Sequence, residues 1–256
     1  MPPTTPGPAL TAAAAIGPYF GWDRWAGGAG WRPFTDLLTD DVAAERVDAA
    51  RSLLCTTFGL ARGAVPVRVV ASVTSLGIAS RLLSPPLGAA VVGGVLPLAG
   101  RGDLWWRPVA GGPWPIAYAG VDGLPCDDLD AAAIAAALVG DPVTALVEAF
   151  RRRFRLSPHV LWGNVASALA GAAGVLADTS PAHAERAAAI VAHALSRPPL
   201  AGTGTLVRPD PSRPRRFLVR RNCCLYYRIP GGGTCGDCVL TPPAERERHW
   251  ESVLAR

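Results

Sequence analysis

The chain has 256 residues, of which half are hydrophobic and 18% are charged, and its formal net charge is +5. A chain of this length can bury a large core, in one domain or in a core with an appendage. Its basic residues are all arginine, and the run at 151–155 is not repeated with interleaved aromatic residues. That excludes the pattern typical of a nucleic-acid-binding protein, and we expect no nucleic-acid partner.

The N-terminal segment, residues 1–34, is rich in proline and glycine. We expect about the first ten residues to be disordered, because such a segment buries too little apolar surface to become ordered. The segment also contains Trp22, Trp25 and Trp31. We expect these tryptophans to cover the core, since large aromatic side chains dominate the energetics of burial.

Two helices are predicted next along the chain. Apolar residues recur at helical spacing from Asp40, and Gly59 ends that helix. Residues 67–83 fit either a strand or a helix, and apolar steps of four and three favour the helix. Pro85-Pro86 is predicted to stop it, because proline lacks the backbone donor and restricts the preceding residue.

The most apolar window of the chain, residues 82–99, contains three prolines and several glycines. A bilayer-spanning helix needs about 20 continuous apolar residues, so we expect no membrane span here. Residues 101–125 are predicted to form a hairpin of short strands on either side of Gly111-Gly112-Pro113.

Helix-capping residues and prolines then mark four further helices. The first is capped by Asp127 or Asp128 and ends at Gly140, and the others span residues 141–155, 157–176 and 180–196. Prolines and glycines at 197–214 predict a linker without regular structure. A short strand at 217–219 and a final helix after Pro242-Pro243 complete the chain.

Four of the six cysteines lie within sixteen residues, as a vicinal pair followed after ten residues by C-x2-C: Cys223, Cys224, Cys235 and Cys238. Thiolates at this density indicate a shared metal centre, and three alternatives stay open: a [2Fe–2S] cluster, zinc, or disulfides. Adjacent side chains of an extended segment point to opposite faces, which suits two irons better than one ion. Gly231-Gly232-Gly233 allows the backbone to turn back so that the pairs meet. Cys55 and Cys126 are interpreted as structural, and the four scattered histidines as ordinary polar residues.

This cysteine pattern resembles that of the FhuF-like family of ferric-siderophore reductases, and Leu161-Trp162-Gly163-Asn164 is similar to the family's Leu-Trp-Gly-Asn helix. The resemblance covers residues from about 35 to 256, by the usual size of a domain. It implies that Cys223, Cys224, Cys235 and Cys238 ligate a [2Fe–2S] cluster. The expected fold is α+β and predominantly α-helical, with a small hairpin region. Its parts are residues 1–34, a helical domain at 35–200, and a cluster-binding segment at 201–256.

The resemblance implies a one-electron reduction of Fe(III) held by a siderophore, with a hydroxamate type as the expected substrate. Further residues are candidates for contacts with the substrate or the electron donor, or for tuning of the cluster: Trp162, Asn164, Arg215, Arg216, Arg220, Arg221, Tyr226, Tyr227 and Arg228. For Asn164, anchoring the cysteine segment and lining the substrate site are equal alternatives. For the two tyrosines, plain packing is an equal alternative.

The chain has no strand followed by a phosphate-binding glycine loop, so we expect no bound nicotinamide or flavin. Electrons would then come from an external donor such as a ferredoxin, a flavodoxin or a reductase. Two other functions stay open: a zinc-stabilised binding domain and a ferredoxin-like carrier. No basic region precedes the first apolar stretch, which predicts a cytoplasmic protein with reduced thiols.

Overall fold

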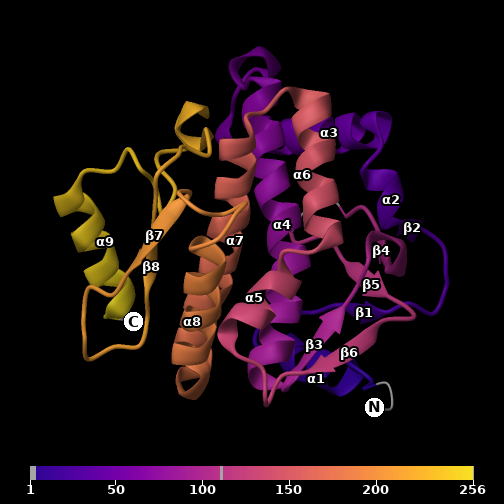
Figure 1. The fold of residues 1–256 in the computed structure, drawn as a ribbon. Coiled ribbons are helices and arrows are strands. Elements are labelled where there is room, and N and C mark those ends of the chain that lie inside the picture. The colour runs from indigo at the N-terminus through magenta and orange to yellow at the C-terminus, as the bar shows by residue number, and fades with distance from the viewer. Residues whose placement is uncertain (1–3, 110–111, 256) are drawn as a thin grey trace.

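Residues 4–109 and 112–255 are described in a computed structural model that is mainly helical, with three small sheets (Figure 1). The α-helices are α1 Gly7–Ala14, α2 Phe34–Leu37, α3 Asp40–Phe58, α4 Val67–Val92, α5 Ala131–Leu138, α6 Asp141–Phe154, α7 Pro158–Thr179, α8 Ala184–Leu195 and α9 Pro243–Leu254. The strands are β1 Asp23–Arg24, β2 Arg32–Pro33, β3 Val95–Leu98, β4 Leu104–Trp106, β5 Ile116–Tyr118, β6 Asp122–Pro125, β7 Gly204–Val207 and β8 Phe217–Arg220. Short 3-10 turns are η1 Arg62–Ala64, η2 Arg101–Asp103, η3 Pro181–His183 and η4 Tyr226–Arg228. The predicted α+β, mainly helical class is confirmed.

The centre of the fold is the packed pair of long helices α4 and α7. Helices α1, α3 and α6 pack on α4, and α8 packs on α7. The six N-terminal strands lie on one side of the helices, and β7, β8 and α9 lie on the other, beyond α7 and α8 (Figure 1). Side chains such as Leu83, Leu87, Leu161 and Leu169 are buried in the shared core. The cysteines therefore belong to a peripheral layer that rests on α7.

Helix α4 continues through Pro85 and Pro86 to Val92, so the predicted stop at these prolines is wrong. Pro85 cannot donate to the carbonyl of Arg81, four residues earlier. The indole Nε1 of Trp22 donates to that carbonyl instead, at 2.8 Å. A partner 59 residues away therefore offsets part of the cost of proline inside the helix.

The N-terminal segment is more regular than its composition predicts. Residues 7–14 form α1, which packs against α4, and Thr4 bridges to Gly123. The expected disorder of about the first ten residues is therefore wrong for residues 4–10, and residues 1–3 lie outside the described residues. Trp22 is buried in the core as expected, whereas Trp25 stays partly exposed and stacks on Trp105 with 4.4 Å between ring centroids.

The predicted hairpin is present as β4 and β5, which pair antiparallel with Leu104 opposite Tyr118. Gly111 of its predicted turn lies outside the described residues. Strands β1 and β2 extend the hairpin to a four-stranded sheet in the order β1-β5-β4-β2. A second antiparallel pair, β3 with β6, was not predicted, because each strand is only four residues long.

The helix boundaries agree closely with the capping signals. Ser157 accepts a hydrogen bond from the backbone N–H of His159 at the start of α7, and Gly59 adopts a left-handed conformation at the end of α3. For α5 the cap is Asp130, which accepts from the backbone N–H of Ala133, rather than Asp127 or Asp128. The segment predicted at 180–196 is divided into η3 and α8.

The predicted structureless linker contains strand β7, which pairs antiparallel with β8 from Gly204 opposite Arg220 to Val207 opposite Phe217. Residues 205–207 supply a β-branched, apolar sequence that becomes a strand once β8 lies beside it. Gly204 is required there, because a Cβ would lie 2.8 Å from the Leu218 side chain. Helix α9 packs on this ribbon through Trp250, which stacks on Phe217 at 5.4 Å.

Within the described residues, α4 and α7 are each long and apolar enough to cross a membrane by length and composition alone. The bent pair α5 and α6 would count as a third such segment. In both α4 and α7, 67% of the apolar window is buried inside the fold. The expectation of no membrane span stays a prediction.

Candidate metal centre

The four clustered cysteines lie on a loop, residues 220–240, which we call the cysteine loop. It leaves the end of β8, and Leu225 adopts a left-handed conformation with a φ of 71°. The turn η4 follows, and Gly231 and Gly233 have φ values of 79° and 69°. These positions reverse the chain where side chains with a Cβ are disfavoured. The reversal returns the C-x2-C pair to the vicinal pair, as the glycine run predicts.

Two sulfur atoms from different pairs are in contact. The Sγ atoms of Cys224 and Cys235 are 3.4 Å apart, too far for a disulfide. Two thiolates bound to one tetrahedral metal at about 2.3 Å would lie about 3.8 Å apart, which is close to this spacing. Cys224 and Cys238 are each 3% exposed, and Cys223 and Cys235 are half-buried. The loop therefore forms an inner and a more accessible side.

Backbone N–H groups point at two of the sulfurs. The Leu225 N–H donates to Cys223 Sγ at 3.2 Å, and the Leu240 N–H donates to Cys238 Sγ at 3.3 Å. Such donors stabilise a negatively charged thiolate and orient it toward a metal. Each of the two cysteine pairs contributes one sulfur that is held in this way.

The thiols differ in acidity. A hydrogen bond from Cys235, with further help from the Tyr226 backbone N–H and the charge of Arg220, lowers the pKa of Cys224 to about 6. The pKa of Cys235 is raised because its proton serves that hydrogen bond and because it is buried. Burial also raises the pKa of Cys223. At neutral pH the metal-free loop thus holds Cys224 as a thiolate, and metal binding must release the protons of Cys223 and Cys235.

The described cysteines do not surround one point. In the part of the chain that the structure describes, no three histidine, cysteine, aspartate or glutamate side chains converge on a point where one ion would fit. A mononuclear zinc site needs about four such ligands around one point. All six cysteines, each within the described residues, are free thiols, which disfavours the disulfide alternative.

Residues 220–240 match the family model described as the FhuF 2Fe-2S C-terminal domain. This segment is FhuF-like. No curated protein matches the chain. The FhuF-like domain is one that binds a [2Fe–2S] cluster, and the cysteines of this chain that fit such a cluster are Cys223, Cys224, Cys235 and Cys238. A cluster at these thiolates supplies one electron at a time.

A buried arginine lies beneath this FhuF-like cysteine loop. Arg220 is 1% exposed, and its guanidinium donates to Asn164 Oδ1 at 3.0 Å, Ser167 Oγ at 2.9 Å and Asn222 Oδ1 at 3.1 Å. Its backbone N–H donates to the carbonyl of Asp237 at 3.2 Å, between the cysteines of the C-x2-C pair. Arg220 therefore connects α7 to both halves of the loop.

The Leu-Trp-Gly-Asn motif has a structural explanation in these contacts. Asn164 is 1% exposed, and its amide donates to the carbonyl of Ser72 on α4 at 2.8 Å. Ser72 Oγ in turn donates to the carbonyl of Cys224 at 2.7 Å. A Cβ at Gly163 would lie 2.1 Å from the side chain of Asn222, so only glycine allows that approach. The motif thus anchors the cysteine loop, and burial of Asn164 disfavours the alternative of a substrate contact.

Several residues of this network were not anticipated from the sequence: Ser72, Ser75, Ser167, Asn222 and Asp237. Ser167 donates to the Asp237 carboxylate, and Asn222 donates to the carbonyl of His159. Asn222 and Asp237 each directly precede a cysteine, and this position in the sequence could have identified them as candidates. The serines carry no local signal, because their role depends on contacts between helices.

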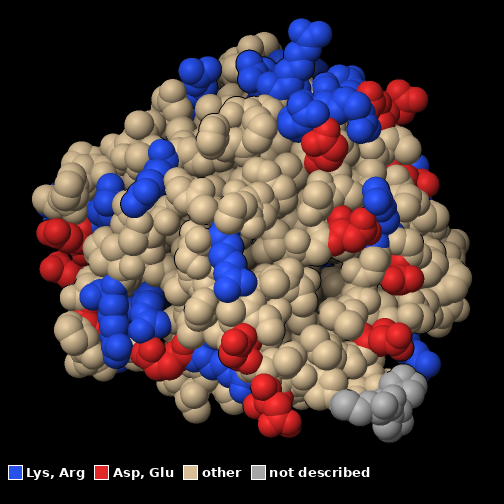
Figure 2. Space-filling model, in the orientation of Figure 1, with Lys and Arg blue, Asp and Glu red and all other residues tan. Residues whose placement is uncertain are grey.

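The structure separates the predicted arginines into two groups. Arg215 pairs with Asp178 and lies over the ring of Phe217 at 5.0 Å, and Arg216 pairs with Glu185 at 2.8 Å. Arg215 also contacts Gly174, seven residues beyond Ser167 on α7, which is about 10 Å along the helix. Basic side chains lie beside acidic ones around much of the face shown in Figure 2. Arg215 and Arg216 are thus neutralised locally, away from the cysteines.

Arg221 and Arg228 are exposed on the cysteine loop itself. The Arg228 guanidinium lies 5.8 Å from the ring centroid of Tyr227, which is 43% exposed. Tyr226 is partly buried against the core, as is Trp162. Tyr227 and the two arginines are therefore the most accessible of the predicted contact residues, whereas Tyr226 and Trp162 also pack on the core.

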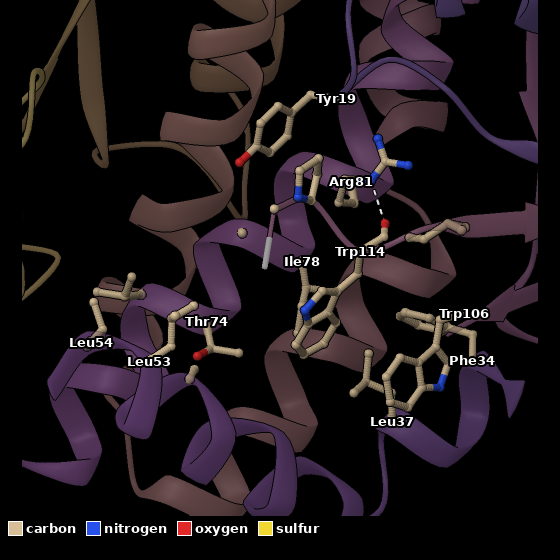
Figure 3. A pocket seen from close by; sticks show the side chains of 16 residues that line it. Tyr19, Phe34, Leu37, Leu53, Leu54, Thr74, Ile78, Arg81, Trp106 and Trp114 are labelled. Atoms are coloured by element: carbon tan, nitrogen blue, oxygen red, sulfur yellow. Dashed lines mark hydrogen bonds between the residues drawn. The ribbon is translucent and has the colours of Figure 1, made fainter. Parts of the chain in front are cut away.

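An apolar pocket lies elsewhere, between α3, α4 and the β4–β5 hairpin (Figure 3). It encloses about 220 Å³, with a mainly apolar lining that includes Phe34, Trp106 and Trp114. The Arg81 guanidinium at its edge donates to the carbonyls of Trp114 and Pro18, each at 2.8 Å, and so has little capacity left for an anion. This lining does not suit the charged oxygens of a ferric siderophore.

Proposed function

We propose that this chain is a ferric-siderophore reductase. One electron passes from a [2Fe–2S] cluster at Cys223, Cys224, Cys235 and Cys238 to Fe(III) held by a hydroxamate siderophore. The single observation that carries the proposal is that the two cysteine pairs meet through Cys224 and Cys235 within the segment that matches the FhuF 2Fe-2S domain. The electron comes from an external protein donor, of the ferredoxin or flavodoxin class or a reductase.

The chemistry of the substrate explains why one electron is enough. Hydroxamate oxygens are hard and anionic and hold Fe(III) far more strongly than Fe(II). Adding one electron to the bound iron therefore releases it, and no bond of the siderophore needs to break. The protein has to bring the complex close to the sulfurs and keep the cluster potential low. All-cysteine ligation supports a low potential, since ferredoxin-type centres lie near about −400 mV.

The accessible side of the cysteine loop supports direct contact with the complex. Cys223 and Cys235 are half-buried, and Tyr227, Val239 and Leu240 are exposed around them. Arg221 and Arg228 add positive charge at the same surface. An anionic iron complex or an acidic donor would be attracted there. We also propose a cytoplasmic location, which the six free thiols support because a reducing compartment keeps cysteines unpaired.

The test uses protein reduced with dithionite and freed of excess reductant under nitrogen. Adding a ferric hydroxamate siderophore should reoxidise the protein, with one Fe(II) captured by a ferrous chelator for each electron. The gallium(III) complex of the same siderophore has a similar shape but accepts no electron, so it should leave the protein reduced. A protein that stays reduced with several ferric siderophores, yet passes its electron to a redox protein, would show a carrier instead.

A further inference from the structure

The charge of Arg220 has no carboxylate partner. Its side-chain partners Asn164, Ser167 and Asn222 are all neutral, and none of the ion pairs among the described residues includes it. The carboxylate of Asp237 is reached only through the hydroxyl of Ser167. Burying a cation without a paired charge is costly, so a nearby negative group is expected to compensate for it.

The position of the guanidinium indicates which group that is. Arg220 Nε donates to the carbonyl of Asn222 at 3.1 Å, the peptide that leads directly into Cys223. The Ser72 hydroxyl holds the carbonyl of Cys224 on the other side of the network. Asn164 joins these two contacts, because its oxygen accepts from Arg220 and its amide donates to Ser72. The charge is thus fixed against the peptides that carry the vicinal cysteines.

We propose that Arg220 is the buried counter-charge of the cluster and sets its reduction potential, while the exposed arginines of the same loop do not. Arg220 affects the reaction only through the reduction potential of the cluster, and it does not touch the substrate. The inference rests on the cluster, and therefore on the cofactor in the proposed function, but not on the identity of the electron acceptor.

Electrostatics gives the sign of the effect. Two ferric ions with two sulfides and four thiolates carry a net negative charge, and one added electron makes that charge more negative. A fixed cation therefore stabilises the reduced form more than the oxidised form. The attraction is strong where burial keeps the dielectric constant low and is weak at the surface, where salt screens it over about 10 Å. Loss of Arg220 should lower the potential, and loss of Arg221 should not.

The experiment measures the midpoint potential of the loaded protein by titration with dithionite and redox mediators, followed by visible absorbance. Arg220→Gln should reduce the ratio of reduced to oxidised cluster at a given potential on the order of tenfold, which is 59 mV for one electron. Arg221→Gln, which removes the same charge from the next residue, is the matched control and should match the wild type. Arg220→Lys keeps the charge, so its midpoint potential should lie between those of Arg220→Gln and the wild type. Iron and sulfide content are measured for every variant.

Each outcome decides the proposal. Unchanged potentials in both glutamine variants, or equal shifts in both, would overturn it. If Arg220→Gln holds no cluster, Arg220→Lys decides: a retained cluster shows that the charge is needed, and a lost cluster shows that only the shape of arginine matters and overturns the assignment. No siderophore is present in these titrations. Failure of the reductase assay would therefore leave this result standing, and failure here would leave the reductase proposal standing.

Discussion

The helical core and the cysteine loop are stabilised in different ways. In α4, α7 and α8, side chains such as Leu83, Leu169 and Ile190 are completely buried against one another. Within residues 220–240 the buried side chains are Arg220, Cys224, Ile229 and Cys238. A segment that buries so little apolar surface cannot offset the entropy of ordering by hydrophobic contacts alone. Its conformation depends on hydrogen bonds to the core and on ligation of its sulfurs.

The largest expected effect separates these two regions. Cys238→Ser removes a buried ligand, so we expect complete loss of the visible absorption of the cluster. Amide hydrogens of residues 221–241 should then exchange rapidly, because metal ligation no longer stabilises their conformation. The amides of α4 and α7 should keep their protection, since apolar packing stabilises these helices independently. Hydrogen exchange followed by mass spectrometry measures both regions in one sample.

Cys126→Ser is the control, because Cys126 is fully buried in the core and its Sγ contacts the carbonyl of Leu124 at 3.3 Å. This variant should keep the cluster. Equal loss of protection in α4, α7 and the loop after Cys238→Ser would show that the two regions unfold as one unit.

Asn164→Ala is expected to have the next largest effect, because it acts where the two regions meet. The change removes one of the three side-chain acceptors of the Arg220 guanidinium and one donor to the Ser72 carbonyl. A buried hydrogen bond to a charged group contributes about 1.5–3 kcal/mol and a neutral one about 1 kcal/mol, so the free energy of unfolding should fall by about 1–3 kcal/mol. Urea titration followed by circular dichroism measures it, and the rate of iron loss to a chelator should rise in parallel. Unchanged stability and unchanged iron loss would contradict the anchoring role.

A smaller effect is expected from one methyl group at Gly163. A Cβ there would overlap the Asn222 side chain, so Gly163→Ala should displace the start of the cysteine loop and accelerate iron loss. Gly171→Ala on the same helix is the matched control, because its Cβ would meet nothing within 4 Å. That change should stabilise α7 by up to about 1 kcal/mol, since alanine has the higher helix propensity. Similar behaviour of the two variants would mean that the close approach of Asn222 is unimportant.

The smallest effect concerns the exposed arginines. Arg221→Glu combined with Arg228→Glu should slow reduction by an acidic ferredoxin several-fold at low salt, and the difference should shrink as salt rises. Arg215→Gln combined with Arg216→Gln should change the rate less, because Asp178 and Glu185 already neutralise these side chains. Stopped-flow reduction at several ionic strengths measures both pairs. A larger effect from the second pair would place the docking surface near the end of α7 instead.

Local signals predicted those parts of the molecule that depend on neighbours in the sequence. Gly59 ends α3, Ser157 caps α7, and the cysteine spacing and glycine run predicted the turn that joins the two cysteine pairs. The errors involve partners far along the chain. Helix α4 continues through Pro85 and Pro86, where Trp22 donates to the Arg81 carbonyl in place of the missing proline N–H. Strand β7 forms because β8 lies beside it.

In the candidate site, too, local sequence signals identified residues but not their distant partners. The sequence predicted the cysteines and identified Asn164 and Arg220 as candidates, but not what they contact. Ser72 lies 92 residues before Asn164 and 152 before Cys224, so no window of the sequence contains that network. The sequence likewise did not show that Arg215 and Arg216 form ion pairs with Asp178 and Glu185.

Helix α4 forms hydrogen bonds with segments near both ends of the chain. Trp22 donates to its Arg81 carbonyl, and its Ser72 donates to the Cys224 carbonyl. The helix is therefore complete only after the last forty residues have been synthesised and have folded back. We expect shortened forms of the protein to be less stable. Removing the first 24 residues would leave the Arg81 carbonyl without the Trp22 donor, and stopping before β8 would leave Asn164 Oδ1 without Arg220 and the Ser72 hydroxyl without the Cys224 carbonyl. While the chain is still bound to the ribosome, these polar groups have no partners and the surface around them stays exposed. A chaperone would be expected to bind the chain during that interval.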